Sequence, residues 1–465
     1  MSGGVETVNP ASALVVVRAN RRWLWLAVGA WLVLNALLLW LYHEPAAKIL
    51  IGDEFDYNRR ALALLDGQAL VEQFIWPPGQ AWFIASVYWI FGQHVLAVQL
   101  VQIALLALCA LLLASLWRRV DSAPAALLAG ALFLLNPSTL AHAHWLWPEV
   151  THLACLLGAL FLLMSDGGRP RARALAAGVL IGLALLFKSL LAGLWPLFLL
   201  CFLRREEGRL RYALMPALLF AGGLLVAIAP ALWKGQVETG RPLIADSSLY
   251  NLKVGIRDSS RSDYIDEAGL PALTAYLDSA STPAERNAIA LKEIRATVAE
   301  RGLTDVLAEQ LGTQYFRLFN AKTLLVSQLP GPACAGRLGA YTNDSLSRPL
   351  IGLAYLGHAL TLVLFAFGIV LWRRWRHPLA AFFGVYLAYQ LALYLGLHVM
   401  QRYLFQMMPV LCAFGGSFLA ALIRRDPASS PLRFTPLRIG LGAALALLLL
   451  ALAWLGPLLD GTCRA

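Results

Sequence analysis

Charged residues are scarce in this chain of 465 residues: they make up only 14% of it, whereas 59% of the residues are hydrophobic. A soluble globular domain carries about 25% charged residues, so the shortage excludes an ordinary soluble domain. Repeated apolar runs of about 20 residues, the length that crosses the hydrocarbon core as a helix, indicate a polytopic membrane protein. The first run, 23–42, is too long for the apolar region of a signal peptide and lacks a small-residue cleavage site, so we expect a retained helix.

Acidic residues are scarcer than basic ones: the chain has 27 Asp and Glu residues against 38 Lys and Arg residues, which gives a net charge of +11. The placement of the arginines argues against a nucleic-acid partner, because they form short clusters between apolar runs. By the positive-inside rule, such clusters mark cytoplasmic loops. The clusters are Arg18, Arg21 and Arg22; Arg118 and Arg119; Arg169, Arg171 and Arg173; Arg204, Arg205, Arg209 and Arg211; Arg373, Arg374 and Arg376; and Arg424, Arg425, Arg433 and Arg438.

The clusters define an alternation that predicts an all-α integral membrane protein with about eleven transmembrane helices. Outward crossings begin near 23, 123, 174, 212, 378 and 437, and inward crossings begin near 94, 149, 191, 349 and 404. The predicted divisions are a cytoplasmic N-terminus (1–22), an N-terminal transmembrane module (23–233) with a catalytic first outer loop (44–93), an outer segment (234–348), a C-terminal transmembrane module (349–459) and an outer C-terminus (460–465).

Three local features refine this topology. The run 77–92 is too short to span and too apolar for solvent, so we expect an interfacial helix. The segment 174–203 must cross twice in few residues, which predicts short helices broken around Lys188. In the mostly helical outer segment, Thr282 and Glu285 fit a capping box, with Gly302 as the helix stop.

Cysteine is also rare, with six residues. Cys109, Cys155, Cys201 and Cys412 fall in predicted membrane helices, where a thiol behaves as a small hydrophobe. Cys334 and Cys463 both fall on the predicted outer side, which favours disulfides in a bacterial cell. Either these two form a disulfide, or both are free thiols.

Ionisable residues gather at the predicted outer ends of the helices, where charge near the membrane is costly and commonly functional. All are predicted at similar depth and would line one polar site. Cations suit a phosphate leaving group, and a carboxylate suits a hydroxyl acceptor. The residues are Asp53, Glu54, Asp56, Arg59 and Arg60 in the first loop; His142, His144, Glu149 and His152; Lys188; and Arg402 with Tyr403.

Structural roles remain open for several of them. Asp53 would serve equally as a helix cap, and Glu149 stands in a first helical turn, where an acid favours the helix dipole. The three histidines would form either a metal site or an interfacial packing cluster with the neighbouring tryptophans. Arg402 would also serve as a headgroup anchor.

Six motifs in order resemble the polytopic GT-C glycosyltransferases, such as the protein O-mannosyltransferases and the bacterial aminoarabinose transferases that modify lipid A. The resemblance covers about 50–420. The motifs are DEFDYNRRALALLDG (53–67), WPPGQAWFIASVYWIFG (76–92), WPEVTHLACLLGALFLL (147–163), GLALLFKSLLAGLWP (182–196), NLKVG (251–255) and HVMQRYLFQMMPVL (398–411).

The resemblance implies transfer of a sugar from a polyprenyl-phosphate donor, with inversion at the anomeric carbon. Matching motif positions give Asp53 the role of base or acceptor-positioning residue, and Glu54 the second acidic position. The resemblance implies no definite cofactor, and whether the site uses a divalent cation stays open. The predicted substrate-binding residues are Tyr57, His144, Glu149, Lys188, Asn251, Arg402 and Tyr403, with Lys188 and Arg402 suited to the lipid phosphate.

The sequence therefore predicts an inverting glycosyltransferase at the outer face of a bacterial inner membrane, with membrane lipids as its surroundings and a lipid, glycan or protein as acceptor. Two alternatives stay open. A transporter or flippase for a lipid-linked saccharide often shows internal repeats, and none is visible here. A ligase acting on an undecaprenyl-diphosphate saccharide would need the basic residues, but not an acidic base in the first loop.

Overall fold

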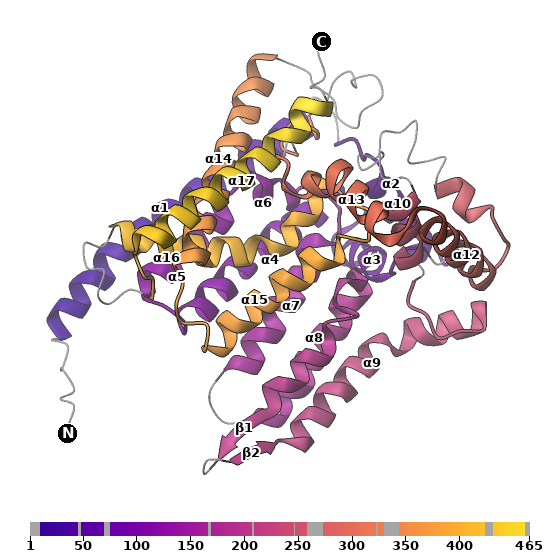
Figure 1. Ribbon diagram of the computed structural model, residues 1–465, viewed down its shortest axis with the longest axis horizontal. Helices are drawn as coiled ribbons and strands as arrows, with labels where there is room; N and C mark the ends of the chain where they lie inside the picture. Colours follow the sequence, from indigo (N-terminus) through magenta and orange to yellow (C-terminus); the bar gives the residue numbers. More distant parts are fainter. Residues whose placement is uncertain are drawn as a thin grey trace.

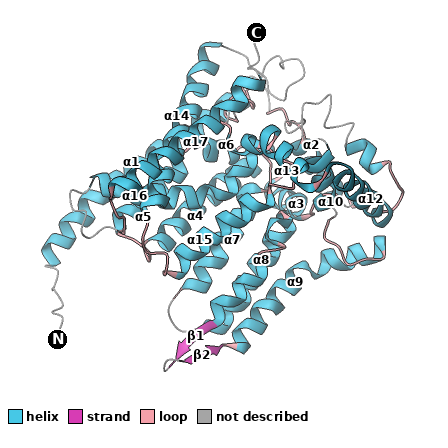
Figure 2. Ribbon diagram, viewed as in Figure 1, coloured by secondary structure: helices cyan, strands magenta, loops and turns pink. Residues whose placement is uncertain are grey.

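The computed structural model of the chain describes residues 10–44, 48–68, 75–165, 169–206, 209–245, 247–257, 273–321, 324–329, 344–423 and 431–460. Helices dominate these residues (Figures 1 and 2). The α-helices are α1 (Pro10–His43), α2 (Asp53–Leu65), α3 (Gly79–Phe91), α4 (Val95–Trp117), α5 (Ala123–Leu135), α6 (Pro137–His142), α7 (Glu149–Met164), α8 (Pro170–Phe187), α9 (Leu214–Thr239), α10 (Ser247–Arg257), α12 (Pro283–Arg301), α13 (Leu303–Thr313), α14 (Asp344–Leu371), α15 (Pro378–Leu393), α16 (Met408–Ile423) and α17 (Pro436–Asp460).

Four 3₁₀ helices and one short hairpin complete the described elements. The 3₁₀ helices are η1 (Ser189–Leu191), η2 (Trp195–Phe202), η3 (Tyr315–Phe319) and η4 (Gln401–Met407). Strands β1 (Leu203–Glu206) and β2 (Arg209–Tyr212) pair antiparallel, with Leu203 opposite Tyr212.

Within the described residues, six helices are long and apolar enough to cross a membrane. They are Val95–Trp117, Pro170–Phe187, Leu214–Val237, Arg348–Leu371, Arg402–Ile423 and Pro436–Leu455, and the shorter apolar helices are Val28–His43, Ala123–Leu135, Glu149–Met164 and Pro378–Leu393. The predicted all-α, multi-pass membrane fold is confirmed, apart from the small hairpin. The count of eleven spans stays a prediction, because the segment after α8 forms the 3₁₀ helices η1 and η2 rather than one long helix.

Helices α8 and α9 lie side by side along their length (Figure 1), and glycines let their backbones touch. A Cβ atom added to Gly178 would lie 2.0 Å from the carbonyl oxygen of Phe220, and one added to Gly223 would lie 2.3 Å from that of Leu175. Small residues at such contacts are a common way to pack membrane helices, since they allow close van der Waals contact. The close packing fixes the end of α8, which carries Lys188.

The arginine clusters that the structure describes meet at one end of the bundle, called here the arginine end. Arg119 donates to the carbonyl of Met164, Arg374 donates to that of Val120 at 3.5 Å, and Arg438 donates to that of Trp372 at 3.2 Å. The β1–β2 hairpin lies at the tip of the α8–α9 pair, at the bottom of Figure 1. These contacts involve three of the six clusters, and the alternation of crossings stays a prediction.

The opposite end, called here the site end, carries α2, α3, α10, α12 and α13, on the right of Figure 1. The predicted interfacial helix is α3. The predicted capping box is confirmed: the amide of Glu285 donates to Thr282 Oγ1 at 3.3 Å, and α12 stops at Gly302, whose φ is 82°. Helix α10 presses against the chain before η4, since a Cβ added to Gly255 would lie 2.5 Å from the carbonyl oxygen of Gly396.

Candidate active site

Asp53 enters the site from the first residue of α2. Gly52 before it has a φ of 57°, a left-handed value that glycine adopts without steric cost, and this turn starts the helix. An acid in the first turn is stabilised by the helix dipole. The Asp53 carboxylate forms an ion pair with Nη2 of Arg402, and its side chain remains 34% exposed.

Three charged side chains from separate elements face Asp53. Glu149 is the first residue of α7, Lys188 follows the last residue of α8, and Arg402 lies in η4. Lys188 Nζ lies 2.8 Å from Glu149 Oε1, and Arg402 Nε lies 3.7 Å from the same oxygen. Helix α8 ends because Lys188 adopts an extended conformation, with φ −150° and ψ 131°. The predicted break at Lys188 is therefore present.

Aromatic rings support the two cations. The Arg402 guanidinium lies over the ring of Trp147, 4.6 Å from its centroid, and 5.7 Å from that of Tyr403. Lys188 Nζ lies over Tyr403 at 4.8 Å. Cation–π contacts attract a cation to the ring face without removing its hydrogen-bond donors. Both cations can therefore be held in place and still bind an anion.

Glu149, Lys188 and Arg402 line a pocket of about 590 Å³, a volume that includes space open to solvent. Asp53 is not a lining residue, and it adjoins the pocket through its ion pair with Arg402. Glu149, Lys188, Arg402 and Tyr403 form its charged side, and Phe187 and Leu190 add apolar surface. Tyr57 of α2 and Asn251 of α10 also line it, with Trp76 and His398. The amide of His398 donates to the carbonyl of Asn251 at 2.9 Å, which ties α10 to the pocket.

Several buried polar atoms of this pocket have no hydrogen-bond partner among the described residues. Glu149 Oε2 and Arg402 Nε are two of them, and the hydroxyl of Tyr394 is another. Buried polar atoms are nearly always hydrogen-bonded, and an unpaired one costs about 1–3 kcal/mol. Glu149 and Arg402 therefore keep hydrogen-bonding capacity that the described residues do not use.

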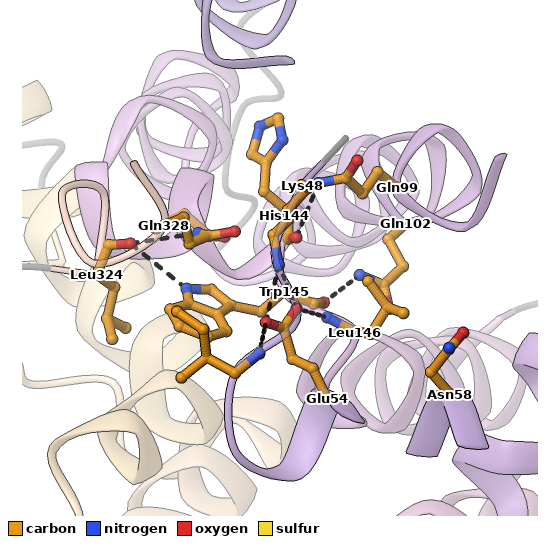
Figure 3. A network of polar contacts seen from close by, with 12 residues as sticks. Lys48, Glu54, Asn58, Gln99, Gln102, His144, Trp145, Leu146, Leu324 and Gln328 are labelled. Carbon is orange, nitrogen blue, oxygen red and sulfur yellow. Dashed lines mark hydrogen bonds and ion pairs between the residues drawn. The ribbon is translucent and has the colours of Figure 1, made fainter. Parts of the chain in front are cut away.

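Glu54, the neighbour of Asp53, does not line the pocket and lies in a network of polar contacts (Figure 3). Lys48 Nζ lies 2.6 and 2.8 Å from its two carboxylate oxygens, and both side chains are fully buried. The amides of Leu146 and Ile51 also donate to it, at 2.9 and 3.3 Å. Burial raises the pKa of the Glu54 carboxyl, while the charge of Lys48 opposes that rise. Glu54 thus joins the first loop to the turn that carries Trp147.

The histidines before α7 also lie inside the protein. His144 Nε2 lies 3.1 Å from Asn35 Oδ1, and its ring packs edge-on against Tyr42. Burial lowers the pKa of His144 to about 3. His142 stacks on Phe405, with ring centroids 4.3 Å apart. Across the described part of the chain, no three His, Cys, Asp or Glu residues come close enough to hold a metal ion.

The structure thus gathers most of the predicted site residues and separates two. Tyr57, Glu149, Lys188, Asn251, Arg402 and Tyr403 line the pocket, and Asp53 is joined to it through Arg402. Glu54 and His144 lie in the packed network behind it. The sequence did not predict that Arg402 lies over the ring of Trp147. It also did not predict the pairing of Lys48 with Glu54, for which the only sequence signal is that Lys48 stands just before the acidic cluster of the first loop. Cys334 and Cys463 lie outside the described residues.

Comparison with known protein families gives a match over part of the chain. Residues 76–233 match the family of dolichyl-phosphate-mannose-protein mannosyltransferases, a stretch that runs from Trp76 through α9. The match includes Glu149 and Lys188 of the pocket. The match covers 158 of the 465 residues, and over that stretch it agrees with the resemblance drawn from the motifs.

Solved structures with a related arrangement include the oligosaccharyltransferase AglB from Archaeoglobus fulgidus, in complex with an inhibitory peptide and a dolichol-phosphate. It is 14% identical, with a TM-score of 0.44, over 92% of this chain and 55% of that one, so the chain spans about half of AglB. ArnT from Cupriavidus metallidurans is 18% identical in the apo state, with a TM-score of 0.40, over 85% and 78% of the two chains. The curated proteins contain no match to this chain.

Proposed function

We propose that the chain is an inverting glycosyltransferase that takes a sugar from a polyprenyl-phosphate donor at the outer face of a bacterial inner membrane. One observation carries the proposal: two cations line one pocket at the end of apolar helices, and one of them, Arg402, is paired with the part-exposed carboxylate of Asp53. The acceptor is a hydroxyl or amine of a lipid, glycan or protein.

Lys188 and Arg402 form the phosphate side of the site. When the bond between the sugar and the lipid phosphate breaks, negative charge grows on the phosphate oxygens, and preorganised cations stabilise that charge. Arg402 offers a planar fork of donors that matches phosphate, and Lys188 adds a point charge. Phe187 and Leu190, which line the same pocket, suit the first isoprene units of such a lipid.

Asp53 is the general base. An acceptor oxygen attacks the anomeric carbon, the carbon–oxygen bond to the phosphate breaks, and the acceptor proton moves to the Asp53 carboxylate. A single displacement of this kind inverts the anomeric carbon and needs one base, unlike the retaining scheme with its carboxylate nucleophile. The other nearby acid, Glu149, is committed to Lys188 through Oε1.

The unpaired oxygen of Glu149 is suited to distinguish one donor sugar from another. Its Oε2 is buried and unpaired, so a sugar hydroxyl or amino group that donates to it removes a desolvation cost. A substrate lacking that donor leaves the oxygen unpaired, and sites of this type discriminate strongly against such substrates. Tyr57 and Asn251, which also line the pocket, complete the contacts with sugar and acceptor.

The sidedness follows from the two ends of the bundle. Arg119, Arg374 and Arg438 mark the arginine end, and the positive-inside rule assigns such an end to the cytoplasm. The pocket lies at the site end, so it faces the periplasm in a bacterial inner membrane.

The test is mass spectrometry of lipid-linked sugars and envelope glycans in cells with and without the gene. Deletion should remove one sugar from the envelope and enlarge the pool of one polyprenyl-phosphate sugar, whose mass identifies the donor. Wild-type and Asp56→Asn genes should restore both, whereas Asp53→Asn should restore neither. Unchanged pools on deletion would contradict the proposal, and a donor retained on the cytoplasmic leaflet would favour the transporter.

A further inference from the structure

Both cations of the pocket are already engaged by carboxylates of the protein. Asp53 holds Nη2 of Arg402, and Glu149 Oε1 holds Lys188 Nζ at 2.8 Å. Two positive and two negative groups leave the site without net charge. An incoming phosphate therefore meets a neutral cluster unless one carboxylate withdraws.

The two carboxylates differ in how easily they can withdraw. The side chain of Glu149 is 1% exposed and lies between both cations. Removing it from that place would leave a buried charge without its partner, which is strongly destabilising. The side chain of Asp53 is 34% exposed and stands on the first turn of α2. It can rotate away from Arg402 and remain solvated.

We propose that Asp53 occupies the anion site of the empty enzyme, and that the lipid phosphate displaces it from Arg402 when the donor binds. The inference rests on the proposed function and assigns Asp53 a second role before its role as base. A guanidinium edge accepts either a carboxylate or a phosphate in the same forked geometry. The two anions therefore compete for one partner.

The exchange couples donor binding to catalysis. In the empty site, the Asp53 carboxylate is engaged by Arg402, so its lone pairs are poorly placed to receive an acceptor proton. Once phosphate holds Arg402, the repulsion between neighbouring anions moves Asp53 toward the open pocket, where the acceptor approaches. The base becomes available only when a donor is present, so the acceptor is not deprotonated before the donor binds.

Binding of undecaprenyl phosphate to the purified protein in lipid nanodiscs tests the exchange. Asp53→Asn removes the competing charge, so this variant should bind undecaprenyl phosphate about tenfold more tightly than the wild type. Asp56→Asn is the matched control: it lies on the same helix, is 33% exposed and pairs with Arg59 at 2.9 Å. Its affinity should equal that of the wild type.

Equal or weaker binding by Asp53→Asn would overturn the inference. Asp53→Ser removes the same charge and replaces Asp53→Asn if the latter misfolds, with the same expectation. Arg402→Ala and Lys188→Ala separate this inference from the proposed function. If neither weakens binding of undecaprenyl phosphate, the phosphate site itself is wrong. If either weakens it while Asp53→Asn does not tighten it, only the exchange is wrong.

Discussion

Replacing Glu54 with Gln tests whether the second acid of the first loop supports the structure or takes part in the chemistry. The carboxylate accepts from Lys48 at 2.6 and 2.8 Å, and it also accepts from the amides of Leu146 and Ile51. Glu54→Gln removes the charge but keeps the size, so it leaves the Lys48 ammonium buried beside a neutral amide. Breaking a buried ion pair in this way costs about 3–5 kcal/mol.

The assay is thermal unfolding of the detergent-purified protein, followed by transfer activity per folded molecule. Glu54→Gln should unfold at a clearly lower temperature than the wild type, and its remaining folded fraction should retain most of its activity. The double variant Lys48→Met with Glu54→Gln should recover stability, because it removes the uncompensated charge and the Gln carbonyl oxygen still accepts from the backbone amides. Wild-type stability combined with lost activity in Glu54→Gln would refute this reasoning and place Glu54 in the reaction.

Further predictions concern the charged side of the pocket, the buried histidine and the membrane sidedness. Lys188→Ala should lower kcat/KM for the donor by about tenfold to a hundredfold, and Lys188→Arg should lower it less. If both variants keep the kcat/KM of the wild type, Lys188 does not bind the phosphate. Glu149→Gln should alter the preference among donor sugars in a competition assay, because the amide nitrogen donates where an oxygen accepted; an unchanged preference would contradict its role. His144 is neutral when folded, since burial lowers its pKa to about 3, while the unfolded chain binds its proton below about pH 6.5. Stability should therefore fall as pH drops from 6.5 toward 3, and His144→Gln should flatten melting temperature against pH. Cysteines introduced within 204–211 should not react with a thiol reagent that cannot cross the membrane, whereas cysteines introduced in α12 should react. The reverse pattern would contradict the predicted topology.

The broad fold could be predicted because its signals are strong and local. Apolar length identifies the crossings, arginine clusters identify one end of the bundle, and Thr282 with Gly302 bounds α12. Lys188 was also predictable as a break, since a lone cation inside an apolar stretch is costly unless it reaches a polar partner. It meets Glu149 at 2.8 Å.

The separation of Asp53 from Glu54 could not be predicted. Successive side chains on a helix point in directions about 100° apart, so one neighbour reaches the pocket and the other reaches the core. Sequence position fixed the depth of both residues but not their direction. His144, in the turn between α6 and α7, also lies in the core, where its ring is hydrogen-bonded to Asn35 across a long stretch of chain. The pairing of Lys48 with Glu54 depends on tertiary packing, which no local pattern encodes.

The most direct test of the central claim is release of polyprenyl phosphate from its sugar in proteoliposomes. Donor lipid isolated from the deletion strain is supplied with acceptor membranes, and wild-type enzyme is compared with Asp53→Asn at equal protein levels. The wild type should release polyprenyl phosphate as sugar appears on the acceptor, and Asp53→Asn should be slower by about 10²–10⁴-fold although it still binds undecaprenyl phosphate. Wild-type rates in Asp53→Asn, or sugar transfer by the wild type without release of polyprenyl phosphate, would contradict the assignment of this pocket.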